Sequence, residues 1–122
     1  MGGNKPSRNK GFTPFPPWQT KTQTGREQLF IRLGTSQMMD EAMLSLTPGA
    51  FQTYCYMLNA ARGKYEFIYP QSQYLKVCAS QAFERRKKEL IEKGFIRISE
   101  NGNNIVGKST LYRFSEEWKE QP

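Results

Sequence analysis

Apolar residues recur at helical spacing in two long stretches of the chain and form short strand-like runs elsewhere. The clearer helix begins at Thr47 and Pro48, because threonine is a favoured N-cap and proline suits the first helical position. Apolar residues then follow at the spacing of one helical face, and Gly63 stands where glycine commonly ends a helix. The buried stripe predicted for this helix consists of Ala50, Phe51, Tyr54, Cys55, Leu58 and Ala61.

The second helix is predicted from Gln81 to Lys93. With Phe83 at the centre of its buried face, a rotation of about 100° per residue places Leu90 and Ile91 on the same face. Lys87 falls between them, where its stem can lie along the core while its ammonium group reaches water. The opposite, outward face carries Gln81, Arg85, Lys88 and Glu92, and Ser80 is a candidate N-cap.

Shorter segments surround these two helices. A short amphipathic helix is expected between Pro70 and Cys78, and with the helix from Gln81 to Lys93 it would form a helix-turn-helix. Another short helix is expected to run through Leu44, with Ser36 as its cap. Strands or extended segments are predicted at residues 29–33, 65–68, 95–98 and 110–114.

Turn-forming residues separate the last two predicted strands. Asn101-Gly102 is a strong hairpin signal, and residues 107–109 are assigned to the same long loop. Gly94, before the first of these strands, is expected to end the second helix. Ser115 is expected to cap a short terminal turn in which Trp118 packs back on the domain.

Residues 1–28 lack regular apolar spacing and are rich in Gly, Asn, Pro, Ser, Thr and Lys, which predicts a flexible arm. Aromatic residues among prolines interrupt this arm, and they could dock on the folded domain or on a protein partner through Phe12, Phe15 and Trp18. The basic residues of the arm could instead reach a DNA groove. The predicted organisation is therefore an arm at 1–28, a domain at 29–118 and a tail at 119–122.

The chain carries 18 Lys and Arg against 11 Asp and Glu, a formal net charge of +7. Residues 1–28 hold five basic residues against one acidic, and residues 64–98 hold eight against four. Such surfaces attract phosphate backbones or anionic membranes. No apolar run approaches the ~20 residues that span a bilayer, and the N-terminal residues lack the apolar core of a signal peptide. A cytoplasmic protein without membrane association is expected.

Several residue types that catalysis commonly requires are missing. The chain has no histidine, and Asp40 is its only aspartate. These absences argue against Ser-His-Asp or Cys-His catalysis, imidazole zinc sites and clusters of carboxylates around metal ions. Cys55 and Cys78 are widely spaced and are expected to be free, buried thiols. The chain is therefore expected to be a binding protein and not an enzyme, with no metal and no cofactor.

The segment from Phe83 to Ile96, FERRKKELIEKGFI, resembles the recognition-helix-to-wing segment of bacterial winged helix-turn-helix proteins. The order of segments upstream, from Phe30 through Leu46-Thr47-Pro48 to Arg62, is similar to that of small winged-helix proteins of phages, plasmids and integrated mobile elements. The resemblance covers residues 29–118. It implies an α+β fold that is mostly α, with three core helices and a wing sheet of two or three strands.

The resemblance also implies a double-stranded DNA-binding protein that regulates transcription or takes part in replication of a mobile element. The helix from Gln81 to Lys93 would enter the major groove, where Gln81 suits adenine and Arg85 suits guanine. The predicted DNA contacts are Ser80, Gln81, Glu84, Arg85, Arg86 and Lys88 on the helix and Asn103, Asn104 and Lys108 in the wing.

A protein-interaction module inside a replication or transcription assembly is the alternative function. The aromatic and proline-rich segment from Phe12 to Trp18 would suit that role. Both a monomer and a homodimer are compatible with the sequence, because winged helices bind DNA in either state. The sequence does not indicate which DNA site is bound.

Overall fold

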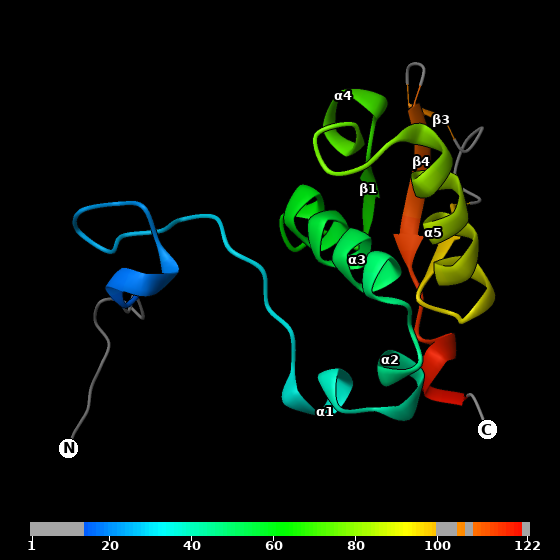
Figure 1. Ribbon diagram of the computed structural model, residues 1–122, viewed down its shortest axis with the longest axis horizontal. Helices are drawn as coiled ribbons and strands as arrows, with labels where there is room; N and C mark the ends of the chain where they lie inside the picture. The colour runs from blue at the N-terminus through cyan, green and yellow to red at the C-terminus, as the bar shows by residue number, and fades with distance from the viewer. Residues whose placement is uncertain (1–13, 100–104, 107–108, 121–122) are drawn as a thin grey trace. The chain divides into compact units, whose positions relative to one another are not determined.

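The computed structural model describes residues 14–99, 105–106 and 109–120, and the chain forms two units, residues 1–30 and 31–122. The first unit contains the short 3-10 helix η1 (Pro17–Gln19). The second unit is a small α+β domain (Figure 1). Its described elements are α1 (Thr35–Met38), α2 (Glu41–Leu44), α3 (Pro48–Ala61), β1 (Glu66–Ile68), α4 (Gln71–Tyr74), α5 (Ser80–Glu92), β2 (Ile96–Ile98), β3 (Ile105–Val106), β4 (Ser109–Phe114) and η2 (Glu117–Glu120).

The ends of α3 confirm the prediction from sequence. The Thr47 hydroxyl accepts a hydrogen bond from the Ala50 N–H at 3.3 Å, and Pro48 opens the helix. Arg62 and Gly63 then both have positive φ, which stops the helix. The buried face is rotated slightly from the predicted one, because Phe51, Cys55 and Leu58 are only half-buried. The fully buried residues are Ala50, Thr53, Tyr54, Met57 and Ala61.

The predicted second helix is also confirmed, as α5. Phe83 and Leu90 are buried on it, and its C-terminal end is closed by a Schellman pair of hydrogen bonds. Gly94 has φ +85°, and its N–H donates to the Ile91 carbonyl at 3.1 Å, while the Phe95 N–H donates to the Leu90 carbonyl at 2.9 Å. The prediction of Ser80 as N-cap is wrong. Ala79 is the cap residue and Ser80 is already helical, because α5 begins one residue earlier than expected.

The segment before α5 is shorter than predicted. α4 covers one turn, and the chain continues in tight turns through Cys78, whose N–H donates to the Tyr74 carbonyl at 3.0 Å. The Tyr74 ring stacks on the Phe83 ring, with centroids 4.0 Å apart and planes 10° apart. This contact fixes α4 against α5.

β4 is the central strand of an antiparallel sheet ordered β1-β4-β2, and β3 pairs with β4, with Ile105 opposite Thr110. Tyr112 is opposite Phe67 on one side and opposite Ile98 on the other. The strands predicted at 65–68, 95–98 and 110–114 are confirmed within a residue or two. Ser109 was assigned to a loop but belongs to β4, because it pairs with Val106. The Asn101-Gly102 turn and residues 107–108 lie outside the described residues.

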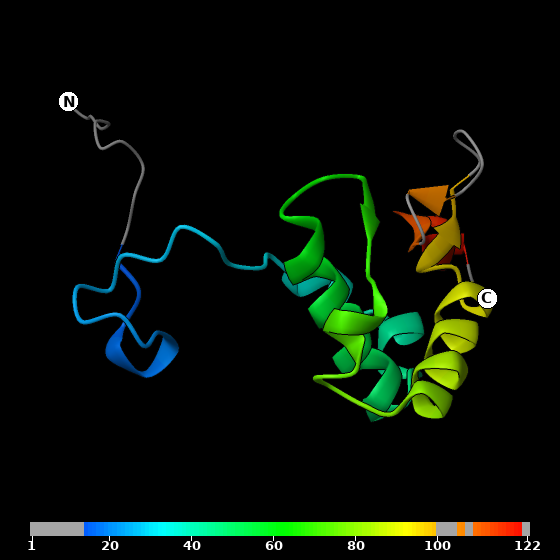
Figure 2. The same cartoon turned by 90° about the horizontal axis from the view of Figure 1, so that it is seen from above.

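The core lies between the two long helices and the sheet, with α3 packed beside β1 and α5 beside β2 (Figures 1 and 2). Aromatic rings join the layers: the Tyr54 ring centroid is 5.5 Å from that of Phe95 and 5.9 Å from that of Phe114. The largest fully buried side chains are Phe83, Phe95, Met57, Leu90 and Ile96. None of the helices in the described part of the chain has the length and apolar content of a transmembrane helix.

The segment that leads into α3 differs from the prediction. Residues 29–33 form no strand, and they are not among the paired strands of the described sheet. The single helix expected from Ser36 to Leu44 is divided into α1 and α2, and Ser36 lies inside α1. Asp40 breaks the run, because its extended backbone and its carboxylate, which accepts from the Ala42 N–H at 2.9 Å, start a new helix.

The chain after β4 folds back as expected. The Ser115 hydroxyl accepts a hydrogen bond from the Glu117 N–H at 3.1 Å, at the start of η2. The Trp118 ring stacks on Phe95 with centroids 5.7 Å apart. The predicted cap at Ser115 and the packing of Trp118 are therefore confirmed.

Candidate nucleic-acid interface

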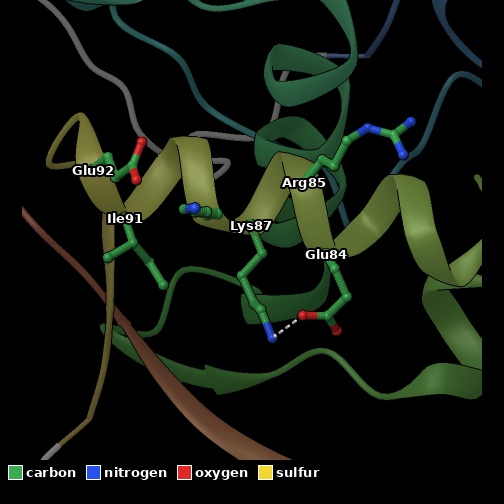
Figure 3. A pocket seen from close by; sticks show the side chains of 6 residues that line it. Glu84, Arg85, Lys87, Ile91 and Glu92 are labelled. Atoms are coloured by element: carbon green, nitrogen blue, oxygen red, sulfur yellow. Dashed lines mark ion pairs between the residues drawn. The ribbon is translucent and has the colours of Figure 1, made fainter.

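α5 presents an outward row of polar and basic side chains. Gln81, Arg85 and Lys88 are all exposed, as the phasing from Phe83 and Leu90 predicted. Within the described ranges, none of these three side chains makes a hydrogen bond, an ion pair or a ring contact with the rest of the protein. Figure 3 shows Arg85 leaving α5 on the side away from Glu84 and Lys87. The row is therefore available to a partner.

Two of the three acidic residues of α5, Glu84 and Glu89, are occupied by contacts inside the domain, while Glu92 is exposed on the outward face. A Glu84 carboxylate oxygen lies 3.0 Å from the Lys87 ammonium group (Figure 3). The Glu89 carboxylate accepts hydrogen bonds from the Thr47 N–H at 2.8 Å and from the Thr47 hydroxyl at 2.7 Å. Because these two carboxylates are paired with other groups, they neutralise less of the positive charge of Arg85 and Lys88.

Arg86 does not join this row, although it was predicted to contact DNA. Its guanidinium group donates to the Gln52 side-chain oxygen at 3.0 Å and to the Thr53 hydroxyl at 3.5 Å, both on α3. It lies so close over Gly49 that a Cβ on that glycine would be 2.5 Å from the Arg86 Nε. Arg86 follows Phe83 by three residues and so shares the side of α5 that faces α3. Its observed contacts hold α5 against α3.

Lys87 occupies the position that the sequence pattern marked as apolar. Its side chain is 23% exposed, and its ammonium group lies 5.5 Å from the centroid of the Phe83 ring. Burial acts to lower the pKa of Lys87, but hydrogen bonds to Glu84 and Tyr112 and the Glu84 charge outweigh burial and raise it. Lys87 therefore stays charged while its stem covers the core, as proposed from the sequence.

The other predicted contact residues are distributed as follows. Ser80 is exposed in the first turn of α5, and Glu84 is exposed but paired with Lys87. Six residues of α5 line an open hollow of about 510 Å³ along the helix: Glu84, Arg85, Lys87, Lys88, Ile91 and Glu92 (Figure 3). Asn103, Asn104 and Lys108 lie outside the described residues.

Two arginines on the sheet are not among the contact residues predicted from the sequence. Arg97 on β2 and Arg113 on β4 are directly opposite each other. Arg97 forms an ion pair with Glu117 at 2.5 Å, and Arg113 donates to the Tyr65 hydroxyl at 3.0 Å. Strand alternation indicates that each side chain points away from the core, but only the register shows that the two are neighbours.

The cysteine thiols and the Tyr69 hydroxyl are other reactive groups of the domain. Cys55 and Cys78 are free and half-buried, which agrees only in part with the expectation of burial, and desolvation raises the pKa of the Cys55 thiol. Burial raises the pKa of Tyr69 to about 12. In the described part of the chain no group of three or more Cys, Asp or Glu side chains is placed to hold a metal ion.

Comparison of the chain with models of protein families, with curated protein sequences and with solved structures found no match in any of the three. The assignment of a function therefore depends on the residues of the domain themselves.

Proposed function

We propose that residues 31–120 form a winged helix-turn-helix domain that binds double-stranded DNA through the outward face of α5. The order of elements supports this: α3, then strand β1, α4, a tight turn and α5, then strands β2, β3 and β4. The observation that carries the proposal is the outward row of Gln81, Arg85 and Lys88. These side chains are exposed on a helix whose other faces are fixed to the domain by Phe83, Leu90 and Arg86.

The proposed binding mode places the N-terminal half of α5 in the major groove. The Gln81 amide suits the N6 and N7 edge of adenine, and the Arg85 guanidinium suits O6 and N7 of guanine. Lys88 lies almost one turn beyond Arg85 and would contact a backbone phosphate, which fixes position but does not read sequence. Asn103, Asn104 and Lys108 would contact the adjacent backbone or minor groove.

The resemblance of residues 83–96 to recognition-helix segments supports action in transcription control or in replication of a mobile element, inside the cytoplasm. A protein-docking role is the second candidate. It is favoured by the exposed apolar side chains of the α1–α2 region, where Leu44 is 61% exposed and Met39 is 60% exposed. Such a patch is typical of a surface that meets another protein.

The proposal is tested with duplex DNA at low salt, using the site preferred by the protein in a random pool. Arg85→Ala should weaken binding to that site by about 1–3 kcal/mol and relax preference at one base pair. Lys88→Ala should weaken all duplexes alike and reduce the slope of log K against log salt by about 1. Lys119→Ala is the matched control, because Lys119 is an exposed lysine on η2 that pairs with Glu116. If Arg85→Ala and Lys88→Ala bind like Lys119→Ala, the assigned face is wrong.

A further inference from the structure

The first unit contains a closed loop over residues 15–25. The Phe15 N–H donates to the Gly25 carbonyl at 2.8 Å, which joins the two ends of the loop. Gly25 is buried with φ +75°, and a Cβ there would lie 2.8 Å from the Phe15 carbonyl oxygen. Only glycine fits this closure. The Phe15 ring also contacts the Phe30 ring, with centroids 5.3 Å apart, so Phe15 has an internal partner.

Trp18 stands on the rigid part of this loop. Pro16 and Pro17 restrict the backbone, and the Gln19 N–H donates to the Pro16 carbonyl at 2.9 Å across η1. The Thr20 hydroxyl donates to the Glu27 carboxylate beyond the far end of the loop. Trp18 itself is 82% exposed. The loop therefore presents the Trp18 ring to solvent. The two prolines and the hydrogen bonds of the loop restrict the conformational freedom of the backbone that carries it.

The segment that carries Trp18 has an excess of basic residues in its sequence. Lys21 is exposed three residues away, and residues 1–30 contain five Lys and Arg against one Glu. The carboxylate of that single acid, Glu27, is already hydrogen-bonded to Thr20. An exposed aromatic ring with an exposed lysine three residues away matches polynucleotide strands, whose unpaired bases offer flat π-faces and whose phosphates are anionic. Protein interfaces, in contrast, enrich tryptophan but are depleted of lysine.

We propose that the loop of residues 15–25 binds single-stranded nucleic acid. An unpaired base stacks on Trp18, and the adjoining phosphate lies near the Lys21 ammonium group. This site belongs to the first unit and does not require that α5 bind duplex DNA. A protein with both sites would hold a duplex and an unpaired strand at once.

The intrinsic fluorescence of the full-length protein tests this directly, because the chain has only two tryptophans, Trp18 and Trp118. Trp118→Phe keeps an aromatic ring against Phe95 and leaves Trp18 as the single reporter. Oligothymidylate and oligouridylate of about 12 nucleotides are then titrated at low salt. We expect saturable quenching of Trp18 emission by either oligonucleotide, and we expect added salt to abolish it. Comparison of the two oligonucleotides shows whether DNA or RNA binds more tightly. Absence of quenching by both, or equal quenching by a duplex of the same length, overturns the proposal.

Affinity measured by anisotropy of a labelled oligonucleotide gives the second readout. Trp18→Ala should weaken single-strand binding by about 5- to 150-fold. Its remaining Trp118 emission reports that the domain is folded. Gln19→Ala, an exposed neighbour on η1, is the matched control and should bind as the wild type does. Unchanged binding by Trp18→Ala overturns the proposal. Because Trp18→Ala should leave duplex binding intact and Arg85→Ala should leave Trp18 quenching intact, failure of one site is distinguishable from failure of the other.

Discussion

At the scale of single residues, Glu89 joins α5 to the first turn of α3. Its carboxylate accepts two hydrogen bonds from Thr47, the residue that caps α3. Lys93, one turn later on α5, donates to the Ser45 carbonyl at 2.8 Å and lies 3.6 Å from the Glu89 carboxylate. The orientation of α5 on α3 is thus held by charged groups at the edge of the core. The direction in which Arg85 and Lys88 point depends on this orientation.

Glu89→Gln should lower the free energy of unfolding by roughly 1 kcal/mol near neutral pH, because bonds to a charged acceptor are stronger than bonds to a neutral one. Burial acts to raise the pKa of Glu89, but the bonds from Thr47 and Lys93 outweigh burial and lower it below its usual 4.5. A depressed pKa means that this stability is complete above about pH 4.5 and is lost as the pH falls through the folded-state value.

Urea unfolding of the wild type and of Glu89→Gln from about pH 7 to about pH 3 measures this effect. The difference between the two proteins should shrink as the pH falls. Glu92→Gln, at an exposed glutamate on the same helix, is the matched control and should follow the wild type. A Glu89→Gln difference that is independent of pH would show that the Glu89 charge contributes nothing.

The directions of single side chains on α5 could be predicted from the sequence only in part. The exposure of Gln81, Arg85 and Lys88 followed from helical periodicity, because each lies far around α5 from Phe83. Arg86 was assigned to the same surface because its charge suits phosphate. Its spacing of three residues from Phe83 already turns it toward α3. Its partners there depend on the close approach of α3 at Gly49, which the pattern within α5 does not report.

At the scale of elements, two glycines close the two long helices in different surroundings. Gly63 after α3 and Gly94 after α5 both have positive φ, +82° and +85°. Apart from Gly63 and its two chain neighbours, no atom of the described residues lies within 4 Å of the position that a Cβ on Gly63 would take. A Cβ on Gly94 would lie 2.7 Å from the Trp118 backbone nitrogen and 2.8 Å from the Glu117 carbonyl carbon. Gly94 therefore also allows η2 to approach the end of α5.

Gly63→Ala and Gly94→Ala form a matched pair that separates backbone strain from the clash with η2. Gly63→Ala should cost about 1 kcal/mol, the penalty of a left-handed conformation alone. Gly94→Ala should cost roughly 3 kcal/mol or more, because backbone atoms of Glu117 and Trp118 must also move. Chemical denaturation with Trp118 emission as the signal measures both. Equal losses for the two variants would contradict the close packing of η2 on Gly94.

Comparison of the predicted and observed helices and strands shows which sequence signals are sufficient to predict an element. α3 is predicted correctly because its cap, its periodicity and its terminal glycine agree. α5 is predicted to within one residue by periodicity and Gly94, although its expected cap at Ser80 is wrong. Residues 29–33 are predicted as a strand or an extended segment, and they form no strand. A strand requires a partner, and the local apolar run does not report one. Asp40 divides α1 from α2 through a capping bond to Ala42, which outweighs the apolar spacing that suggested one helix.

At the scale of the whole molecule, the described buried core belongs to a single unit. Its buried apolar residues fall between Ala42 and Tyr112, and the first unit, residues 1–30, contributes none of them. From the sequence, a boundary between an arm and a domain is expected at residue 28. The sequence did not predict the closed loop around Trp18, because that closure depends on a hydrogen bond between Phe15 and Gly25.

A protein that begins at Ile31 should therefore fold as the full chain does. Its thermal midpoint should lie within about 5 °C of the full-length value, which corresponds to less than about 1 kcal/mol. Circular dichroism and Trp118 emission give the midpoint, and the full chain with Trp18→Ala is the control for loss of the exposed ring alone. A much larger decrease would mean that residues 1–30 stabilise the domain.

β4 is the last strand of the domain along the chain, yet it lies at the centre of the sheet. Glu66 in β1 pairs with Arg113 in β4, so the pairing joins residues separated by about half of the unit. During synthesis, both long helices and the outer strands β1 and β2 leave the ribosome before the strand that joins them. Until residue 114 has emerged, the edges of β1 and β2 that pair with β4 have no partner strand. Chaperones that shield apolar nascent segments would find their target in this interval.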